Sequence, residues 1–192
     1  MGKSNTRRYT AAVIGCGAIG MLGERDMKQI KPATHAGAYA VHKRITLVAL
    51  VDVDSKNKKN AAQLFPGVQF FSNPEIMLKK MRPDIVSVAT HTDTHVPLTE
   101  LCMRSGVRAI MCEKPLAEKS KEGVALLRLQ KKYPQSLVFV NHIRRFDPLL
   151  KDAAQKVREG FIGEVLQATA YYTKGIRNNG THAIDLLRYF CG

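Results

Sequence analysis

The feature that most constrains this chain is a glycine-rich motif at the end of its first apolar run. Residues 9–14 predict a buried strand, which breaks at Gly15 into a G-x-G-x-x-G motif completed by Gly17 and Gly20. The first glycine allows a tight turn, the second lets a backbone approach a pyrophosphate, and the third allows close packing of helix on strand. Because a helix N-terminus then faces the negative charge, the motif predicts a phosphate-binding turn.

A second apolar run makes this interpretation more specific. Residues 46–51 lead directly into Asp52, and a carboxylate there can accept both hydroxyls of an adenosine ribose. Glycine-rich turns alone are common, but the two features together predict a dinucleotide-binding fold. Asp52 disfavours a 2′-phosphate by repulsion and so favours NAD, although Lys56, Lys58 and Lys59 are near enough in the sequence to leave NADP open.

The acidic residue lies further from the glycine motif than the usual spacing of about 20 residues. The extra length is residues 21–33, a polar segment with Gly23 and Pro32. We expect a loop inserted after the first turn of a helix, which resumes after a cap at Thr34 and continues to Val41. At the carboxyl edge of a sheet, such a loop either covers a cofactor or is decoration.

Predicted strands and helices then alternate, as in an α/β fold with a doubly wound parallel sheet of the Rossmann type. Further strands are predicted at residues 68–71, 85–89, 107–112 and 137–140. Helices are predicted at residues 55–64 and 120–132; another begins near Pro74, and another ends at Arg104. We assign residues 1–142 to this dinucleotide-binding domain.

The pattern changes in residues 143–192. A helix capped by Asp147 is predicted to Arg158, followed by a turn framed by Gly160 and Gly163. A long strand is predicted at residues 165–173, and a helix from Thr181 or His182 to Phe190. Because one strand and two helices cannot close a second core, we expect the beginning of an α+β open-sheet domain that is incomplete in this sequence.

The formal net charge of +14 on 192 residues first suggests a nucleic-acid surface or attraction to anionic substrates. However, the basic residues are spread over the outer faces of the predicted helices and are not interleaved with aromatic residues. No nucleic-acid motif is present either, so we expect a solvated basic surface and no nucleic-acid partner.

Composition also bounds the cellular setting. No stretch approaches the roughly 20 apolar residues of a membrane span, so no membrane association is expected. The four scattered cysteines form no C-x-x-C pair, which favours buried thiols in a reducing cytoplasm. Met1-Gly2 with Thr6 imitates a myristoylation pattern, and Arg7-Arg8 imitates a twin-arginine signal, but a strand and glycine turn explain the start better.

Three clusters at predicted strand ends have the residue types of a functional site. The first contains Thr90, His91, Asp93 and His95. It forms either a capped loop, a metal site built from its alternating side chains, or a cofactor contact through Thr90 and His95. With no further ligand cluster to support a metal, cofactor contact is favoured by position.

The second cluster is Glu113-Lys114-Pro115, and the third includes His182 and Asp185. A lysine that leaves a buried strand just before a proline is held in extended geometry, from which it can polarise or protonate a substrate oxygen. His182 and Asp185 are three residues apart on one helical face, where a carboxylate can fix the tautomer of a general base. The alternatives are a surface lysine in a turn and a capping or core histidine.

Taken together and in order, these segments resemble the Gfo/Idh/MocA family, which includes glucose–fructose oxidoreductases and inositol dehydrogenases. The similarity is carried by residues 13–20, 89–95, 113–115, 141–148 and 180–189. It implies an NAD(P)-dependent oxidoreductase that transfers hydride between the nicotinamide and a secondary alcohol or ketone of a sugar, polyol or sugar derivative. It also implies a homo-oligomer at full length.

The resemblance further implies roles for individual residues. Lys114 matches the catalytic lysine, His182 the histidine that takes the hydroxyl proton, Asp185 its support, and Arg144 a residue that approaches the substrate. Asn178 stands where the family often has aspartate, so it can bind a substrate hydroxyl but cannot take its proton. Many members hold the peptide bond after this lysine in the cis form.

The cofactor site implied by the motifs and the resemblance uses NAD and no metal. Its expected residues are Gly15, Gly17, Ala18, Ile19, Asp52, Thr90, His91, His95, Glu113 and Lys114. His91 replaces the usual proline, which leaves open how its loop contacts the nicotinamide.

Family members continue well beyond this length, with an open sheet that completes the substrate pocket and the oligomer interface. Three interpretations therefore stand at this point. The chain is a fragment or truncated product of a sugar dehydrogenase, or a short protein that binds the dinucleotide without turnover. The third is a basic nucleic-acid or metal-binding module.

Overall fold

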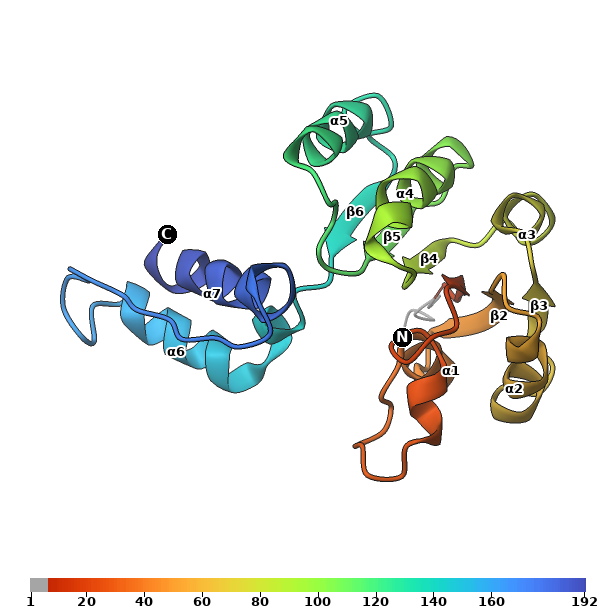
Figure 1. Ribbon diagram of the computed structural model, residues 1–192, viewed down its shortest axis with the longest axis horizontal. Coiled ribbons are helices and arrows are strands. Elements are labelled where there is room, and N and C mark those ends of the chain that lie inside the picture. The colour runs from red at the N-terminus through yellow and green to blue at the C-terminus, as the bar shows by residue number, and fades with distance from the viewer. Residues whose placement is uncertain (1–6) are drawn as a thin grey trace, which may run out of the picture. The chain divides into compact units, whose positions relative to one another are not determined.

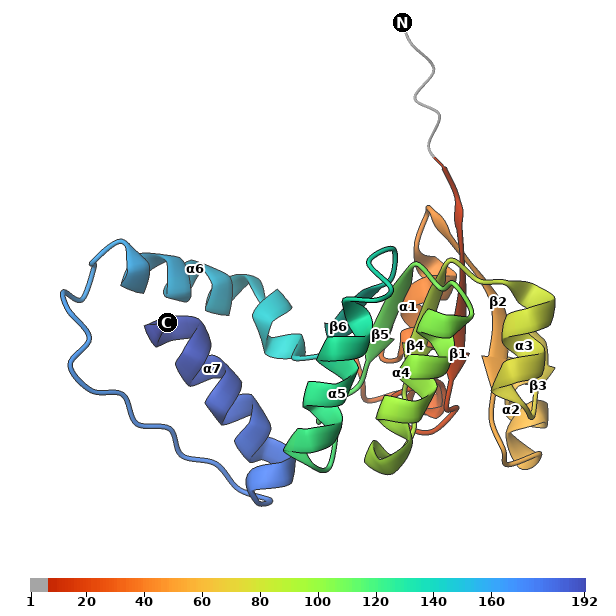
Figure 2. The ribbon, with the colours of Figure 1, turned by 90° about the horizontal axis from the view of Figure 1, so that it is seen from above.

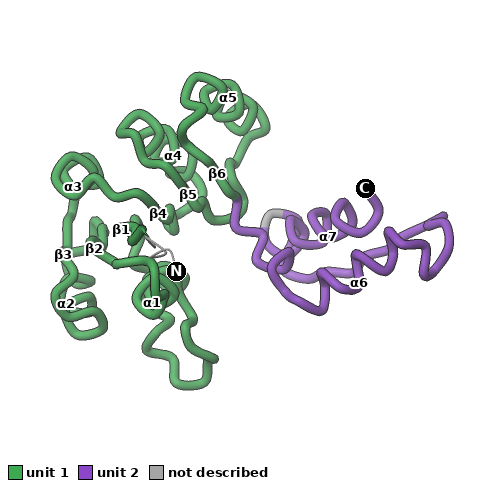
Figure 3. Tube along the Cα trace, turned by 180° about the vertical axis from the view of Figure 1, so that it is seen from behind, with its two compact units in different colours: residues 1–139 green, residues 140–192 purple. Residues whose placement is uncertain are grey.

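The computed structural model describes residues 7–192, with Arg177 described by its backbone alone. The Met1-Gly2 and Thr6 pattern therefore lies outside the described residues. The chain divides into two compact units, of which the first extends to Phe139 and the second runs from Val140 to Gly192 (Figure 3). Each unit is described by itself.

Unit 1 is built on a six-stranded sheet with the strand order β3-β2-β1-β4-β5-β6. The strands are β1 (Tyr9–Ile14), β2 (Ile45–Val51), β3 (Gln69–Phe71), β4 (Ile85–Val88), β5 (Ala109–Cys112) and β6 (Leu137–Val140). All six lie where the sequence predicts strands, and the β1–β2, β1–β4, β2–β3 and β4–β5 pairs are parallel. The winding reverses between β1 and β4, and open α/β sheets bind ligands outside the carboxyl ends of the strands at such a point.

Five helices cover the two faces of this sheet, with α1 and α2 on one side and α3, α4 and α5 on the other (Figure 1). Their bounds are α1 (His35–Val41), α2 (Lys56–Leu64), α3 (Pro74–Met81), α4 (His95–Arg104) and α5 (Ser120–Gln130). The predicted doubly wound α/β fold is thus confirmed.

Each face of the sheet has its own core, because successive residues of a strand point to opposite sides. Ile14 belongs to a cluster that includes Met77 of α3 and Met103 of α4. Its neighbour Val13 belongs to the other cluster, with Ala36 of α1. The apolar runs in the sequence are therefore continuous because both faces of these strands are buried.

The insertion predicted at residues 21–33 interrupts a helix that continues across it in space. The backbone N–H groups of His35 and Ala36, at the start of α1, donate to the carbonyl oxygens of Ile19 and Gly20 at 3.1 and 3.0 Å. The hydrogen-bond ladder thus passes from the glycine turn directly to α1. The prediction of a loop inserted after the first helical turn is confirmed.

Glu24, in a short 3-10 helix (Leu22–Arg25), closes this insertion. Its carboxylate accepts hydrogen bonds from the N–H groups of Ala33 and Thr34 at 2.7 and 2.8 Å and from the Thr34 hydroxyl at 2.9 Å. The Thr34 hydroxyl in turn accepts from the Gly37 N–H at 3.0 Å, which is the predicted N-cap. Burial tends to raise the pKa of Glu24, but these hydrogen bonds and the nearby Lys31 outweigh it and lower that pKa.

Unit 2 contains two helices that lie side by side, α6 (Pro148–Arg158) and α7 (Thr181–Cys191) (Figure 2). The Asp147 side chain caps α6 as predicted, accepting from the N–H of Leu149 at 2.8 Å. Short helical turns precede the two helices, a 3-10 turn (Ile143–Phe146) before α6 and a π turn (Ile176–Gly180) before α7.

The strand predicted at residues 165–173 is wrong. The structure gives this segment no regular secondary structure, and Leu166 and Tyr171 are 88% and 95% exposed. A strand needs the hydrogen bonds of a neighbouring strand, and in the described backbone of residues 141–192 there is no strand to provide them. The apolar pattern alone therefore does not produce a strand here.

Within residues 7–192, no helix is both long and apolar enough to cross a bilayer.

Candidate functional site

The three glycines of the motif have different surroundings, which fit the three roles expected of them. Gly15 adopts φ +96°, and a Cβ there would come within 2.5 Å of the Ala89 carbonyl oxygen. A Cβ on Gly20 would overlap the carbonyl oxygen of Gly15, whereas one on Gly17 would meet no atom within 4 Å. The turn is therefore closed at its two ends and open in its middle, where a ligand has to approach.

The open part of the turn consists of Gly17, Ala18 and Ile19, all exposed at the carboxyl end of β1. These residues begin the helical turn that α1 continues, so their backbone N–H groups belong to a helix N-terminus. Such N–H groups and the helix dipole favour a phosphate or another anion. The arrangement fits the pyrophosphate of a dinucleotide.

Asp52, at the end of β2, is bonded to the glycine turn. Its Oδ2 accepts from the Cys16 N–H at 2.7 Å and from the Asn57 side-chain amide at 3.1 Å, and its Oδ1 accepts from the Asp54 N–H at 2.8 Å. The carboxylate is thus held in one orientation beside the turn, while an ionised carboxylate has about four lone-pair positions. Burial, together with the negative charge of Asp52, raises the pKa of the Cys16 thiol to about 12.

The loop after β4 has an exposed face and a buried anchor. Thr90 accepts a hydrogen bond from the Thr94 hydroxyl at 2.7 Å, and His91 is exposed. His95 is 1% exposed, and its Nδ1 and Nε2 lie 2.7 and 3.0 Å from the carbonyl oxygens of Pro115 and Thr90. This placement ties the loop after β4 to the loop after β5, so we expect a positioning role for His95 and cofactor contact from the residues on the exposed face.

Metal binding by this loop has no support in the part of the chain that the structure describes. No three His, Cys, Asp or Glu side chains gather there closely enough to hold an ion.

The Glu113-Lys114-Pro115 segment follows β5 at the same edge of the sheet. The Glu113 N–H donates to the Val88 carbonyl at 2.9 Å, and the Glu113 carboxylate lies 2.9 Å from the His35 ring and 3.3 Å from the Lys114 N–H. The Lys114–Pro115 peptide bond is cis. Because β1, β2, β4 and β5 are parallel, the glycine turn, Asp52 and this lysine segment all lie at the carboxyl edge of the sheet.

Unit 2 brings together Asp185 and His182 of α7 with two residues that the sequence did not single out. The Asp185 carboxylate accepts from Arg145 Nε at 2.9 Å and Nη2 at 2.8 Å, and it lies 3.8 Å from His142 Nδ1. The rings of His142 and His182 meet edge to face, with 5.9 Å between their centroids. His142 and Arg145 therefore lie in the same cluster as His182 and Asp185, and the support of His182 by Asp185 stays a prediction.

The remaining predicted substrate residues, Arg144 and Asn178, are exposed in unit 2. Sequence reasoning missed His35, His142 and Arg145. The signals available were modest: His35 is the first residue of the resumed helix, and the other two lie in the 141–148 segment.

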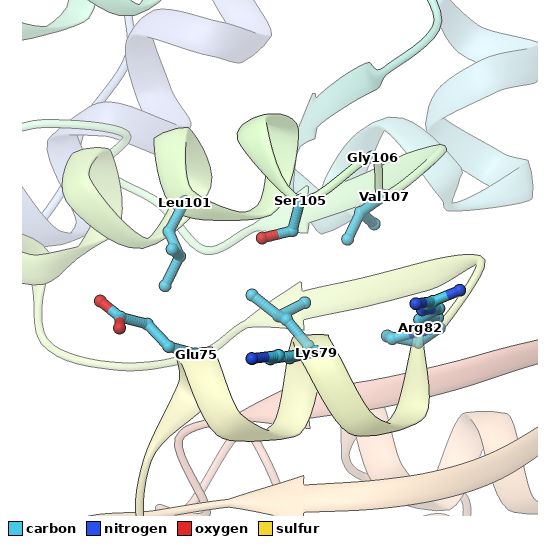
Figure 4. A pocket seen from close by; sticks show the side chains of 9 residues that line it. Glu75, Lys79, Arg82, Leu101, Ser105, Gly106 and Val107 are labelled. Atoms are coloured by element: carbon cyan, nitrogen blue, oxygen red, sulfur yellow. The ribbon is translucent and has the colours of Figure 1, made fainter.

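The structure also contains a hollow of about 530 Å³ between α3 and α4 (Figure 4). Its lining is mixed in polarity and includes Glu75, Lys79, Arg82, Leu101, Ser105 and Val107. Pro83 and Val107 line it just before β4 and β5, so this hollow lies toward the amino ends of these strands. It includes none of the predicted site residues.

Comparison with known proteins agrees with this geometry. The model of the Gfo/Idh/MocA oxidoreductase family, described as having an NAD-binding Rossmann fold, matches residues 9–142. The chain therefore belongs to this family.

A relative of this chain is inositol 2-dehydrogenase 2 of Saccharopolyspora erythraea, 28% identical over 191 residues, which are 94% of this chain and 53% of the relative. The crystal structure of myo-inositol 2-dehydrogenase from Lactobacillus plantarum matches with a TM-score of 0.79 and 26% identity, over 97% of this chain and 57% of that one.

Scyllo-inositol dehydrogenase from Lactobacillus casei, solved with NAD(H) and scyllo-inositol, matches in fold with a TM-score of 0.80 and 20% identity, over 97% of this chain and 57% of that one. The chain thus spans about half the length of the relatives it matches.

Proposed function

We propose that this chain is the cofactor-binding half of an NAD-dependent dehydrogenase that oxidises a secondary alcohol of a sugar, a polyol or a sugar derivative. One observation carries the proposal: an open glycine turn, a fixed carboxylate and a lysine segment share the carboxyl edge of a doubly wound sheet. Membership of a family with an NAD-binding fold and the inositol dehydrogenases among its relatives support the cofactor and the substrate class.

The residues present fit the cofactor. The exposed backbone of Gly17, Ala18 and Ile19 would hold the pyrophosphate, because the space beside Gly17 is open. Asp52 would hold the adenosine ribose, and its charge opposes a 2′-phosphate, which supports NAD over NADP. When bound, NAD supplies the hydride acceptor.

The nicotinamide side of the cofactor would rest against a second set of residues. We assign it to Thr90, His91, Glu113 and Lys114, all on the loops that follow β4 and β5.

The chain's own residues would then carry the acid–base chemistry. His182 would take a proton from a substrate hydroxyl, and Lys114 would donate a hydrogen bond to a substrate oxygen. Asp185 would support His182, with Arg145 fixing the Asp185 carboxylate. Arg144 and Asn178 bind other substrate hydroxyls, since an amide can hydrogen-bond them without taking a proton.

Residues 143–192 are, in this proposal, the start of the substrate domain, following a dinucleotide-binding domain of residues 1–142. The exposure of large apolar side chains in unit 2, such as Leu149 and Phe161 at 79% each, supports further covering in a full-length homo-oligomer. Buried free thiols at Cys16, Cys102 and Cys112 support a reducing, cytoplasmic location. We include no nucleic-acid partner, because no binding motif accompanies the basic residues.

A second candidate function is dinucleotide binding without turnover, which is supported by the open glycine turn and the fixed Asp52 carboxylate of unit 1 alone. Calorimetry with NAD and NADP on wild-type protein and on Gly17→Val tests what the two candidates share. The added side chain meets no protein atom within 4 Å of its Cβ, so the variant should melt like wild type yet lose NAD binding. Wild-type protein without affinity for either nucleotide would reject both candidates.

Turnover on a panel of sugars and polyols then separates the two candidates. NADH formation by a protein of the relatives' full length supports the dehydrogenase, and binding without NADH formation supports the binding module.

A further inference from the structure

A chain of polar contacts lies beneath the carboxyl edge of the sheet, and of its four residues the roles assigned above use only Glu113. Glu113 Oε1 lies 2.9 Å from His35 Nε2, His35 Nδ1 lies 3.0 Å from Ser87 Oγ, and Ser87 Oγ lies 2.7 Å from Tyr39 Oη. The side chains of His35 and Glu113 are only 11% and 13% exposed. Water therefore competes little for these contacts.

The direction of each hydrogen bond follows from the chemistry of the groups. An ionised carboxylate only accepts, so His35 Nε2–H donates to Glu113. In the tautomer that carries its proton on Nε2, the Nδ1 atom accepts from the Ser87 hydroxyl, whose oxygen accepts from Tyr39. Burial raises the pKa of Tyr39, although the Ser87 hydrogen bond opposes this, so its hydroxyl keeps the proton that it donates. Every polar atom in the chain of contacts is thus satisfied.

His35 also contacts residues on both sides of the point where the winding reverses, between β1 and β4. Its backbone N–H donates to the Ile19 carbonyl in the glycine turn at 3.1 Å. Its ring holds the carboxylate of Glu113, whose other oxygen lies 3.3 Å from the Lys114 N–H. His35 therefore contacts the phosphate-binding turn directly and, through the Glu113 carboxylate, is linked to the backbone N–H of Lys114.

We infer that His35 is a positioning residue, which orients Glu113 and the backbone of Lys114 relative to the glycine turn. Its ring couples the nicotinamide side of the cofactor site to the pyrophosphate side. This inference rests on the proposed function, because it takes NAD as the ligand of this edge of the sheet.

The test compares two ligands and a pair of variants of equal size. NAD spans both sides of the site, whereas ADP carries only the adenosine and the diphosphate. His35→Met removes the ring donor, and His35→Gln keeps an amide N–H that can reach Glu113 in a side chain of similar length. Tyr39→Phe alters only the far end of the contacts, and His42→Ala changes another histidine, the C-cap of α1.

Calorimetry on the folded 192-residue chain is expected to show NAD affinity weakened about tenfold in His35→Met, since a buried carboxylate loses its donor. ADP affinity should stay at the wild-type value, and His35→Gln should recover most of the NAD affinity. Tyr39→Phe and His42→Ala should bind both ligands as wild type does. Thermal melts verify folding, and His35→Leu replaces the methionine variant if that variant does not melt cooperatively.

Three results would overturn the inference: unchanged NAD affinity in His35→Met, equal weakening of NAD and ADP, or equal behaviour of the glutamine and methionine variants. Wild-type protein that binds neither nucleotide would instead refute the proposed function.

Discussion

The two units differ most in how they treat their apolar side chains. In unit 1, Val13, Leu50 and Ile110 are 0% exposed, because helices cover both faces of the sheet. In unit 2, Phe161 is 79% and Ile184 48% exposed. The contrast shows that unit 1 carries its own core, whereas the two helices of unit 2 share little buried apolar surface. The proposed cofactor site belongs to unit 1, whose apolar side chains are covered, and the His142–His182–Asp185 cluster belongs to unit 2.

The largest expected effect is a loss of turnover, and it should separate the proposed catalytic role of unit 2 from the proposed cofactor binding of unit 1. In a protein of the relatives' full length, Lys114→Ala and His182→Ala are each expected to lower kcat by about 10²–10⁴-fold. His182→Ala removes the proposed proton acceptor, and Lys114→Ala removes the proposed hydrogen-bond donor to the substrate. In the present chain, His182→Ala should leave NAD affinity unchanged, since all the proposed cofactor residues belong to unit 1. Steady-state kinetics and calorimetry measure the two effects, and undiminished kcat in both variants would contradict the assignment.

The next effect concerns stability. Ile110→Ala in unit 1 is expected to lower the free energy of unfolding by about 2–5 kcal/mol, because it leaves a cavity in a closed core. Ile184→Ala in unit 2 should change it by about 0.5 kcal/mol, as for other exposed positions. Urea titrations followed by circular dichroism compare the pair, and equal losses would show that the two units do not differ as described.

A smaller effect is expected inside unit 1, at the insertion. Glu24→Gln should lower the free energy of unfolding by about 1 kcal/mol, because it weakens charged hydrogen bonds to Ala33 and Thr34. The folded state lowers the pKa of Glu24, so this stability is present above its ordinary pKa of 4.5 and is lost as pH falls through the lowered folded value.

Measured across pH, the difference between wild type and Glu24→Gln should therefore shrink only below about pH 4.5. The matched control is Glu118→Gln, which changes an exposed carboxylate in the same unit. A difference that grew on acidification would contradict the role of Glu24.

The smallest expected effect is a difference in cysteine reactivity between the buried thiols of unit 1 and the exposed thiol of unit 2. Cys16, Cys102 and Cys112 are buried in unit 1, and burial raises the pKa of each thiol to about 12, whereas Cys191 of unit 2 is exposed. Iodoacetamide at neutral pH should therefore modify Cys191 first and the other three only on unfolding. Peptide mass spectrometry over time reads the order, and early labelling of Cys112 would show that unit 1 opens more readily than its core suggests.

The sequence predicted unit 1 closely because its signals are local. Runs of buried residues marked the strands, Thr34 marked a helix start, and the displaced Asp52 indicated the insertion. The His35–Glu113 contact could not be predicted in this way, since it joins residues 78 positions apart. No periodicity encodes such a pair.

The strand predicted at residues 165–173 was wrong because its local signal was not matched by a long-range partner. Its local pattern favours a strand, but strand formation depends on a partner strand elsewhere in the fold. The same limit applies to the surroundings of Asp185. The helical spacing predicts that Asp185 supports His182, but no local pattern indicates that the guanidinium of Arg145 binds the same carboxylate.

The position of α1 in the fold does not depend on the number of residues in the insertion that precedes it. Because α1 takes its hydrogen bonds from Ile19 and Gly20, the sheet supports one continuous helix, whatever number of residues leaves and returns in between. Lengthening a flexible closed loop is cheap, about 0.6 kcal/mol for each doubling. Homologous chains can therefore gain or lose residues in this insertion while the residue equivalent to His35 keeps its position in the fold. An alignment without gaps would pair His35 with a residue that is not its structural equivalent.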